Sequence, residues 1–281
     1  MPETSVLLEI AAGVAVVTLN RPGKLNAFAG EMRGQLLARL DEAAAREDVR
    51  VLVITGAGKA FCAGGDVEHM ADLAARGAPF EELAPLLEAG ETIVRRMASL
   101  PVPVIAALNG VAAGAGANLA LACDVRLASD AAKLGETFVK IGLHADWGGS
   151  YHLARLAGVA KALDLCWTGD LVGADEALRL GLVQRVWPAG DFEREWRAYT
   201  ANLAAGPQVA IRAVKASLRA APARSLAECL AAERDAQAAC WASPDAAEGV
   251  RAFAEKRAAS FASASPASGE RPPSRAARTF E

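Results

Sequence analysis

Two glycine-rich stretches of the sequence contain residue types that suit the binding of a developing negative charge. In residues 110–124, GVAAGAGANLALACD, small side chains occupy most positions, and residues 61–67, FCAGGDV, contain a glycine pair. Each stretch is predicted to lead into a helix, whose first turn carries unpaired N–H groups and a partial positive charge. Two such loops side by side would form an oxyanion hole for an enolate or a tetrahedral intermediate. The alternatives are close packing of a helix on a sheet and two ordinary tight turns. A dinucleotide-binding loop is excluded because Leu119 stands where that pattern requires glycine.

A carboxylate is available downstream, at Asp146 in the segment HADWGG. Trp147 beside it would exclude water and so raise the pKa of the carboxyl group. The alternative for Asp146 is a turn or cap residue. Glu136 is a candidate second acid, because on an extended segment its side chain would face the same side as that of Phe138.

Other reactive side chains near these stretches fit structural roles better. His144 and His152 flank the acidic loop, but their spacing matches no metal site, and no metal is expected. Cys62 has no adjacent base, so it is interpreted as a small buried residue and not as a nucleophile.

Strand and helix patterns alternate through the first two thirds of the chain, which predicts an α/β domain with largely parallel strands. Two β-rich runs split by Ala11-Ala12-Gly13 indicate a hairpin, and leucines at helical spacing indicate a helix over about 30–46. The remaining expected elements are a strand at 50–56, a helix at 80–100, a strand before Asn109 and a short strand at 124–129.

From about Asp191 onward the strand patterns stop and helical patterns continue to residue 261. We interpret residues 1–190 as an α/β core and 191–261 as a helical region whose apolar faces pack on another subunit. Residues 262–281 are rich in Ser, Pro, Ala and Arg, a composition typical of a disordered tail.

Composition narrows the classes of function. The chain has 281 residues, is 53% hydrophobic and carries a net charge of −3, so a nucleic-acid partner is not expected. No apolar run reaches membrane-spanning length, and the N-terminus lacks the pattern of a signal peptide. The five cysteines are scattered and form no CxxC pair, as expected of free thiols in a reducing compartment. These features predict a cytoplasmic enzyme or binding protein that takes a small molecule.

Six motifs in order carry a family resemblance: NRPGKLNAF, TGAGKAFCAGGDV, NGVAAGAGANLALACDVRLAS, KIGLHADWGG, GLVQRV and EGVRAFAEKR. In this order and at this spacing they resemble the crotonase superfamily, the enoyl-CoA hydratase/isomerase family, over nearly all of residues 5–261. The resemblance implies a crotonase-like spiral of ββα repeats with a C-terminal helical oligomerisation region. It also implies a homotrimer or a hexamer built as a dimer of trimers.

The resemblance assigns a role to individual positions. The backbone N–H groups of Gly65 and Ala115 would bind the thioester oxygen of an acyl-CoA substrate, and Lys24 would lie near the CoA phosphates, as a cation suited to phosphate. Coenzyme A thioester is then the substrate, and no separate cofactor is implied. Further CoA contacts are expected at Ala27, Ala63, Gly64, Asp66 and Gly114, and at Phe253 and Lys256 of a neighbouring subunit.

The sequence departs from the family's hydratase pattern at its two glutamate positions, which here hold Asn118 and Phe138. Neither side chain can act as a general base. Asp146 matches the acidic residue of isomerase branches, and the segment looks most like the ring-1,2-epoxyphenylacetyl-CoA isomerase branch. We therefore expect an acyl-CoA isomerase with Asp146 as its single acid/base. The alternatives are an enoyl-CoA hydratase using Glu136 or Asp146, and a non-catalytic acyl-CoA-binding relative.

Overall fold

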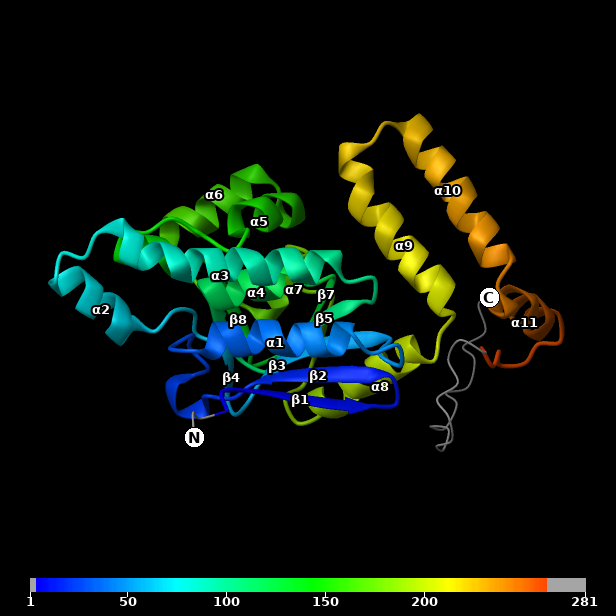
Figure 1. Ribbon diagram of the computed structural model, residues 1–281, viewed down its shortest axis with the longest axis horizontal. Coiled ribbons are helices and arrows are strands. Elements are labelled where there is room, and N and C mark those ends of the chain that lie inside the picture. Colours follow the sequence, from blue (N-terminus) through cyan, green and yellow to red (C-terminus); the bar gives the residue numbers. More distant parts are fainter. Residues whose placement is uncertain (1–3, 262–281) are drawn as a thin grey trace.

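The computed structural model describes residues 4–261 and consists of two sheets wrapped by helices (Figure 1). Within this range the larger sheet has six strands and the smaller sheet has four. The larger sheet has the order β1 (Val6–Ala11), β2 (Val14–Leu19), β3 (Val51–Gly56), β5 (Val104–Leu108), β7 (Val125–Ser129) and β10 (Arg185–Trp187). The smaller sheet has the order β4 (Ala60–Cys62), β6 (Val111–Ala113), β8 (Lys133–Gly135) and β9 (Val172–Gly173).

Consecutive strands alternate between the two sheets, and this alternation produces a spiral. Strands β3, β5 and β7 belong to the larger sheet, and the strand that follows each of them, β4, β6 or β8, belongs to the smaller one. Each pair leads into helical structure. Apart from the antiparallel pairs β1–β2 and β8–β9, the strands run parallel. The expected α/β spiral of ββα repeats is confirmed.

The helices fall into a core group and a C-terminal group (Figure 1). The core group is α1 (Met32–Ala44), α2 (Val67–Ala75), α3 (Phe80–Ser99), α4 (Ala115–Ala122), α5 (Gly149–Ala157), α6 (Val159–Thr168), α7 (Ala174–Arg179) and α8 (Phe192–Ala204). The C-terminal group is α9 (Gln208–Ala220), α10 (Leu226–Trp241) and α11 (Pro244–Ala254). Short 3-10 helices are η1 (Pro22–Lys24), η2 (Thr137–Ile141) and η3 (Ala221–Ala223).

Successive side chains along the central strands point to opposite faces of the larger sheet, and both faces are apolar. On β3, Leu52 and Ile54 join the main core while Val51 and Val53 join a second cluster on the opposite face. The second cluster is completed by Phe192 and Trp196 of α8 and by neighbouring residues. Burial on both faces is typical of parallel sheets. Helix α8 therefore packs on the sheet, although it lies beyond the boundary at residue 190 proposed from the sequence.

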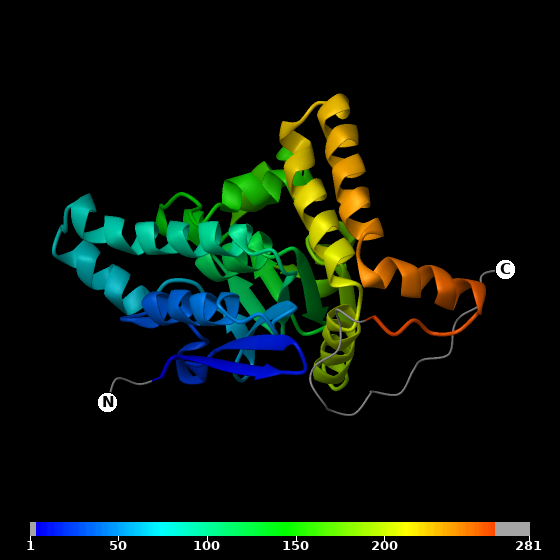
Figure 2. The same cartoon turned by 45° about the vertical axis from the view of Figure 1, so that its right-hand side comes forward.

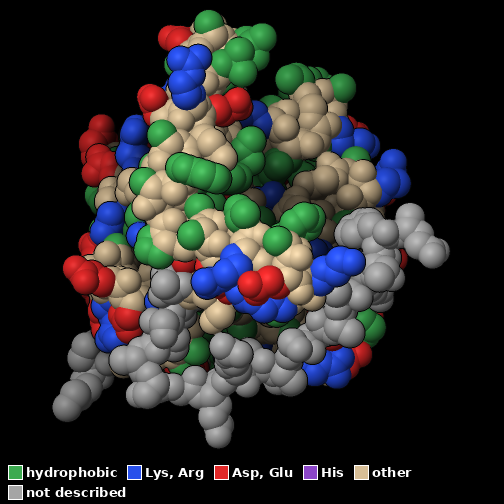
Figure 3. Space-filling view, turned by 90° about the vertical axis from the view of Figure 1, so that its right-hand side faces the viewer, with side chains coloured by type: hydrophobic (Ala, Val, Ile, Leu, Met, Phe, Trp, Pro, Cys, Tyr) green, Lys and Arg blue, Asp and Glu red, His purple; other side chains and the backbone are tan. Residues whose placement is uncertain are grey.

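Helices α9 and α10 form a hairpin that extends away from the sheets, and α11 follows at the far end (Figures 1 and 2). Large apolar side chains are exposed along this hairpin and α11, and Figure 3 shows hydrophobic groups on this side of the molecule. They include Val214, Leu218, Leu226, Trp241 and Phe253. No helix within residues 4–261 is long and apolar enough to cross a membrane. The tail expected at 262–281 lies outside the described residues.

Candidate active site

Parallel pairing of β4 with β6 brings the two glycine-rich loops together. Cys62 pairs with Ala112, so the loops that follow both strands leave the same edge of the smaller sheet. Gly64 has a φ of +99°, and a Cβ at this position would lie 2.8 Å from the Ala113 carbonyl oxygen and 3.5 Å from the Ala115 nitrogen. A side chain at Gly64 would therefore fill the space between the loops. Glycine is required by this close approach as well as by its backbone conformation.

Gly65 and Ala115 each carry a backbone N–H group beside this junction. Within the described residues, neither N–H donates to a protein acceptor outside regular secondary structure. Ala115 is the first residue of α4, where an N–H has no partner inside the helix. Gly114 precedes it with a φ of +51° and donates its own N–H to the Gly135 carbonyl at 3.0 Å. Both amides are thus available to one ligand oxygen, which is the arrangement that an oxyanion hole needs.

The predicted CoA loop is held against the first glycine-rich loop by backbone hydrogen bonds. Ala63 donates to the Leu25 carbonyl at 2.9 Å, and Phe28 donates to the Gly64 carbonyl at 2.7 Å. The Arg21 guanidinium donates to the Ala27 carbonyl at 2.6 Å within the loop of residues 21–28. This loop and the glycine-rich loop of residues 63–65 are called the joined segment below. The fold therefore brings these predicted contact positions together.

Two charged residues border the joined segment. Asp66 caps α2 by accepting the Glu68 N–H at 3.1 Å and contacts the Arg21 guanidinium at 3.5 Å. Lys24 Nζ lies 2.5 Å from Glu68 Oε1, and both of these side chains are exposed. The hydrogen bond from Lys24 to Glu68 raises the pKa of the lysine, so Lys24 is protonated at neutral pH. A phosphate group would compete with Glu68 for this cation.

Asp146 lies in the loop before α5, and two hydrogen bonds to its carbonyl oxygen fix the loop. The Gly149 N–H donates to this oxygen at 2.8 Å and the Asn118 side-chain amide donates at 2.9 Å. Asn118 is fully buried and lies so close to Gly149 that a Cβ there would overlap it. Asn118 therefore positions the acidic loop.

Burial raises the pKa of the Asp146 carboxyl group to about 6, while the positive charge of Arg33 opposes the rise. Trp147, the next residue in the chain, is also buried. Its indole packs over Gly90, and its ring centroid lies 4.7 Å from that of Phe28. The direction of this shift is the one expected from the sequence. A carboxyl group with a pKa near neutrality is suited to taking up and returning a proton.

Glu136 is more deeply buried than Asp146, with 2% of its surface exposed. Neither carboxylate oxygen has a hydrogen-bond partner within the described residues. Burial raises the pKa of Glu136 to about 7, the Asn118 amide opposes the rise, and the charge of Asp146 adds to it. The segment from Thr137 is a 3-10 helix and not the extended strand assumed from the sequence. Glu136 and Phe138 nevertheless line one cavity, of about 280 Å³.

Cys62 is buried, and the two histidines beside the acidic loop differ in exposure. Burial raises the pKa of the Cys62 thiol to about 12, so it stays protonated at neutral pH. His144 is exposed and lies 2.6 Å from the Ala145 carbonyl, and burial lowers the pKa of His152 to about 4. No group of three or more acidic, His or Cys side chains within residues 4–261 could hold a metal ion.

Phe253 and Lys256 lie far from the two loops of their own chain. Phe253 is the penultimate residue of α11 and is 88% exposed, and Lys256 follows the helix with a φ of +52°. Helix α11 and helix α2, which begins beside Gly65, lie at opposite ends of the molecule in both views (Figures 1 and 2). The expected contact of these two residues with CoA in a neighbouring subunit therefore stays a prediction.

Arg33 is a site residue that the sequence reasoning missed. Its side chain is buried, and its guanidinium carbon lies 5.4 Å from the centroid of the Phe28 ring. Desolvation lowers the pKa of Arg33, and the charge of Asp146 opposes that effect. A signal was present, because Arg33 shares the i, i+3, i+4, i+7 stripe of Leu36, Leu37 and Leu40. An arginine on a core-facing stripe predicts a buried charge, and such a residue is a candidate site residue.

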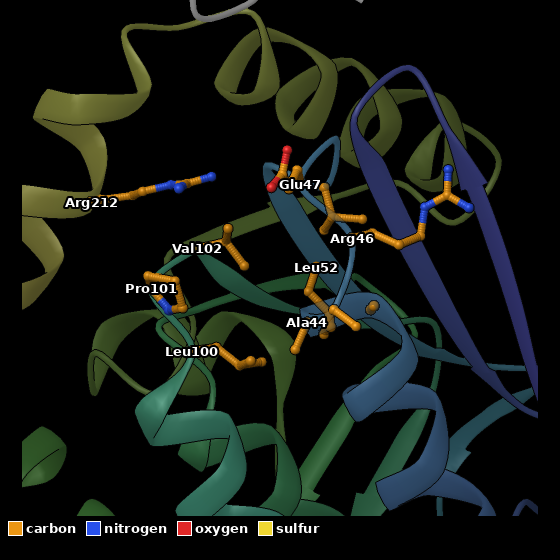
Figure 4. A pocket seen from close by; sticks show the side chains of 11 residues that line it. Ala44, Arg46, Glu47, Leu52, Leu100, Pro101, Val102 and Arg212 are labelled. Atoms are coloured by element: carbon orange, nitrogen blue, oxygen red, sulfur yellow. The ribbon is translucent and has the colours of Figure 1, made fainter.

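A different cavity, of about 410 Å³, lies apart from all of these groups (Figure 4). Its walls come from the ends of α1 and α3, from β3 and from α9, whose Arg212 side chain reaches toward it. None of the residues predicted to act in catalysis or CoA binding lines this cavity. We therefore place the candidate active site at the two glycine-rich loops and the Asp146 loop.

Comparison with known proteins shows which family the whole chain resembles. The family model described as enoyl-CoA hydratase/isomerase matches residues 9–264. A protein of Rhodobacter capsulatus named "Probable enoyl-CoA hydratase" is 43% identical over 92% of this chain and 97% of its own length. The 1,2-epoxyphenylacetyl-CoA isomerase of Escherichia coli is 38% identical over 91% of this chain and 97% of its own. The crystal structure of an enoyl-CoA hydratase from Bacillus anthracis superposes with a TM-score of 0.85 at 32% identity, covering 92% of this chain and 98% of that one.

Proposed function

The chain belongs to the enoyl-CoA hydratase/isomerase family, and from this premise we propose that it is an acyl-CoA isomerase with Asp146 as its acid/base. The Gly65 and Ala115 amides would polarise the thioester carbonyl and hold the enolate that forms when the carbon next to it loses a proton. Asp146 would take that proton and return it at another carbon, or assist the departure of a ring oxygen.

One observation carries this proposal: Asp146 lies in the loop that Asn118 holds, while the two positions expected to carry the hydratase glutamates hold Asn118 and Phe138. Asn118 donates a hydrogen bond to the Asp146 loop, and the Phe138 ring packs beside Gly114. The pKa of Asp146 is raised to about 6, so the group can both accept and return a proton near neutral pH. With Asp146 alone acting as the acid/base, transfer of a proton within a substrate is favoured over net addition of water.

Enoyl-CoA hydratase is the second candidate, and Glu136 favours it. This buried carboxyl group senses the charge of Asp146 and has a pKa of about 7, so the pair could in principle activate a water molecule. Several similar proteins are named hydratases. A non-catalytic binding role has less support, because the site holds two buried carboxyl groups whose pKa values are raised toward neutrality, which suits proton transfer.

A panel of CoA thioesters in oxygen-18 water separates these functions. The panel contains a 2-enoyl, a 3-enoyl, a dienoyl and an aryl-epoxide thioester, and mass spectrometry follows the products. An isomerase gives products that keep the mass of the substrate, apart from hydrogen exchange at carbon, and contain no heavy oxygen. Labelled 3-hydroxyacyl-CoA would identify a hydratase. Tight binding of all four thioesters without any product would identify a binding protein.

A further inference from the structure

The loop that carries Asp146 is tied to α4 by the side-chain amide of Asn118. Asn118 Nδ2 donates to the Asp146 carbonyl oxygen at 2.9 Å, and the residue is fully buried. The other polar atom of this amide, Oδ1, has no hydrogen-bond partner within residues 4–261. A buried acceptor without a donor is costly, and an amide that is paired at one end only is held less firmly. A donor to Oδ1 would therefore fix the amide and, through it, the Asp146 loop.

Strand pairing places Glu136 beside the first turn of α4. Ala113 of β6 pairs with Gly135 of β8, and the Gly114 N–H donates to the Gly135 carbonyl at 3.0 Å. The Gly114 carbonyl accepts the Asn118 N–H at 3.0 Å, so Asn118 lies one turn into the helix. Glu136 directly follows Gly135 and is 2% exposed. The Asn118 amide is accordingly close enough to act on the pKa of the Glu136 carboxyl group.

Acceptors outnumber donors where these two side chains meet. Asn118 Oδ1 and both carboxylate oxygens of Glu136 are buried without a hydrogen-bond partner in the part of the chain that the structure describes. An ionised carboxylate only accepts hydrogen bonds, so it would draw the Asn118 N–H groups toward itself and away from the Asp146 carbonyl. A protonated carboxyl group supplies the missing donor, because its O–H can pair with Oδ1. Protonation of Glu136 thus leaves the Asn118 N–H to the Asp146 loop.

We propose that Glu136 is a positioning residue, which in its protonated state donates to Asn118 Oδ1 and so fixes the amide that holds the Asp146 loop. The Glu136 oxygens are buried, so this residue acts through Asn118 and not on the substrate. Ionisation of Glu136 removes the donor and loosens the loop. The inference rests on the proposed function in taking Asp146 as the reacting group.

This role predicts a bell-shaped pH dependence. Burial raises the pKa of Glu136 to about 7, and the charge of Asp146 adds to the rise. The protonated fraction of Glu136 therefore falls as the pH rises through about 7, whereas Asp146 becomes ionised as the pH rises through about 6. Two more titratable groups, His144 and Cys166 of α6, line the same cavity as Glu136. Burial and the charge of Glu136 raise the pKa of Cys166 above its ordinary value of 9.0, so this thiol stays protonated near pH 7.

The first experiment compares the pH–rate profiles of the wild type and its variants on a CoA thioester that the wild type isomerises. The wild type should lose kcat/KM as the pH rises above about 7. Glu136→Gln carries a permanent N–H donor, so it should keep the wild-type rate at the optimum and lose this alkaline limb. Glu136→Leu also lacks the limb, but without a donor its kcat should be about tenfold lower at a nearly unchanged KM, the effect of one hydrogen bond. His144→Gln is the matched control and should keep the limb, since histidine side chains also change charge near neutral pH.

A second experiment follows the loop without turnover. Trp147 directly follows Asp146, and its indole packs over Gly90. Fluorotryptophan is incorporated, and fluorine NMR follows the Trp147 resonance, which is identified by its absence from Trp147→Phe. The titration is made in Asp146→Asn, where the neighbouring carboxyl group no longer titrates. The resonance should shift as Glu136 ionises and should stay in place when Glu136→Gln is added.

The proposal is overturned if Glu136→Gln or the wild type gives the opposite limb behaviour, if the limb disappears in His144→Gln, or if Glu136→Leu matches Glu136→Gln in kcat. It is also overturned if the Trp147 resonance does not respond to the ionisation of Glu136. A protein whose Trp147 resonance responds in this way but that isomerises nothing would contradict the proposed function alone.

Discussion

Folding removes two carboxyl groups from water at this site, and their surroundings differ. Asp146 senses the positive charge of Arg33, which opposes the effect of burial on its pKa. Glu136 has no such cation among the causes of its shift, and its pKa rises further, to about 7. At neutral pH Asp146 is therefore largely ionised and can act as a base. Glu136 is divided between its two protonation states.

Ionising Asp146 in the folded protein costs stability, so Asp146→Asn should stabilise the fold. The carboxyl group ionises at its ordinary pKa of 3.8 in the unfolded chain and at about 6 in the folded one. Between these values only the unfolded chain is ionised, so the wild type loses stability as the pH rises through this window. The gain in melting temperature of Asp146→Asn should be absent near pH 4, grow up to about pH 6 and then stay constant. An equal gain at every pH would show that Asp146 titrates normally.

Arg33 should set the acid limb of the pH–rate profile. Activity requires ionised Asp146, so kcat/KM should fall as the pH drops through about 6. Arg33→Met removes a charge that favours the ionised form, which raises the pKa of Asp146 and moves the acid limb to higher pH. Arg33→Lys retains the charge and should leave the limb near its original position. A profile for Arg33→Met that coincides with the wild type would rule out this electrostatic role.

At the scale of elements, the ββα turns of the spiral bring loops that lie far apart in the sequence together at one site. The long helices and the strands of the larger sheet could be predicted, because each spans enough residues to show a period. The strands β4, β6 and β8 could not, since each has three residues and none shows an alternation. The glycine-rich loops were recognised by composition. The contact of Asn118 with the Asp146 loop required the fold, because 28 residues separate the two positions.

Replacement of the first residue of α4 tests the backbone donor of this element. Ala115→Pro removes the N–H, and proline is tolerated at the first helical position because that N–H has no partner in the helix. Loss of one oxyanion donor should lower kcat about 10²- to 10³-fold. Ala115→Gly keeps the donor and should stay close to the wild type. If the proline variant folds and turns over at the wild-type rate, the α4 loop does not hold the oxyanion.

At the scale of the whole molecule, the α9–α10 hairpin and α11 present apolar side chains that this chain does not cover. Val214, Leu218, Leu226 and Trp241 are each more than half exposed. Such surfaces mark contacts with other proteins. The helical character of this region could be predicted from its periodicity. Its extension away from the sheets could not, because an apolar stripe looks the same whether its partner is the same chain or a second copy.

We expect a homotrimer or a hexamer in solution, with Phe253 and Lys256 of one copy reaching the CoA bound by another. Leu218→Glu places a charge on the exposed apolar face of α9 and should shift sedimentation toward smaller species while weakening acyl-CoA binding. Leu7→Glu is the control, since Leu7 is also exposed but belongs to β1. A wild type that sediments as a stable monomer at micromolar concentration would contradict this assembly.

Proton abstraction by Asp146 from the carbon next to the thioester is the central claim, and hydrogen exchange in deuterium oxide measures it most directly. NMR follows the loss of the α-carbon protons of a 3-enoyl-CoA, whether by exchange or by rearrangement. We predict that the wild type removes these protons and that Asp146→Asn does so at least about 10²-fold more slowly, at nearly unchanged affinity for the thioester. Glu136→Gln should still remove them. Proton loss that persists in Asp146→Asn and disappears in Glu136→Gln would contradict the account.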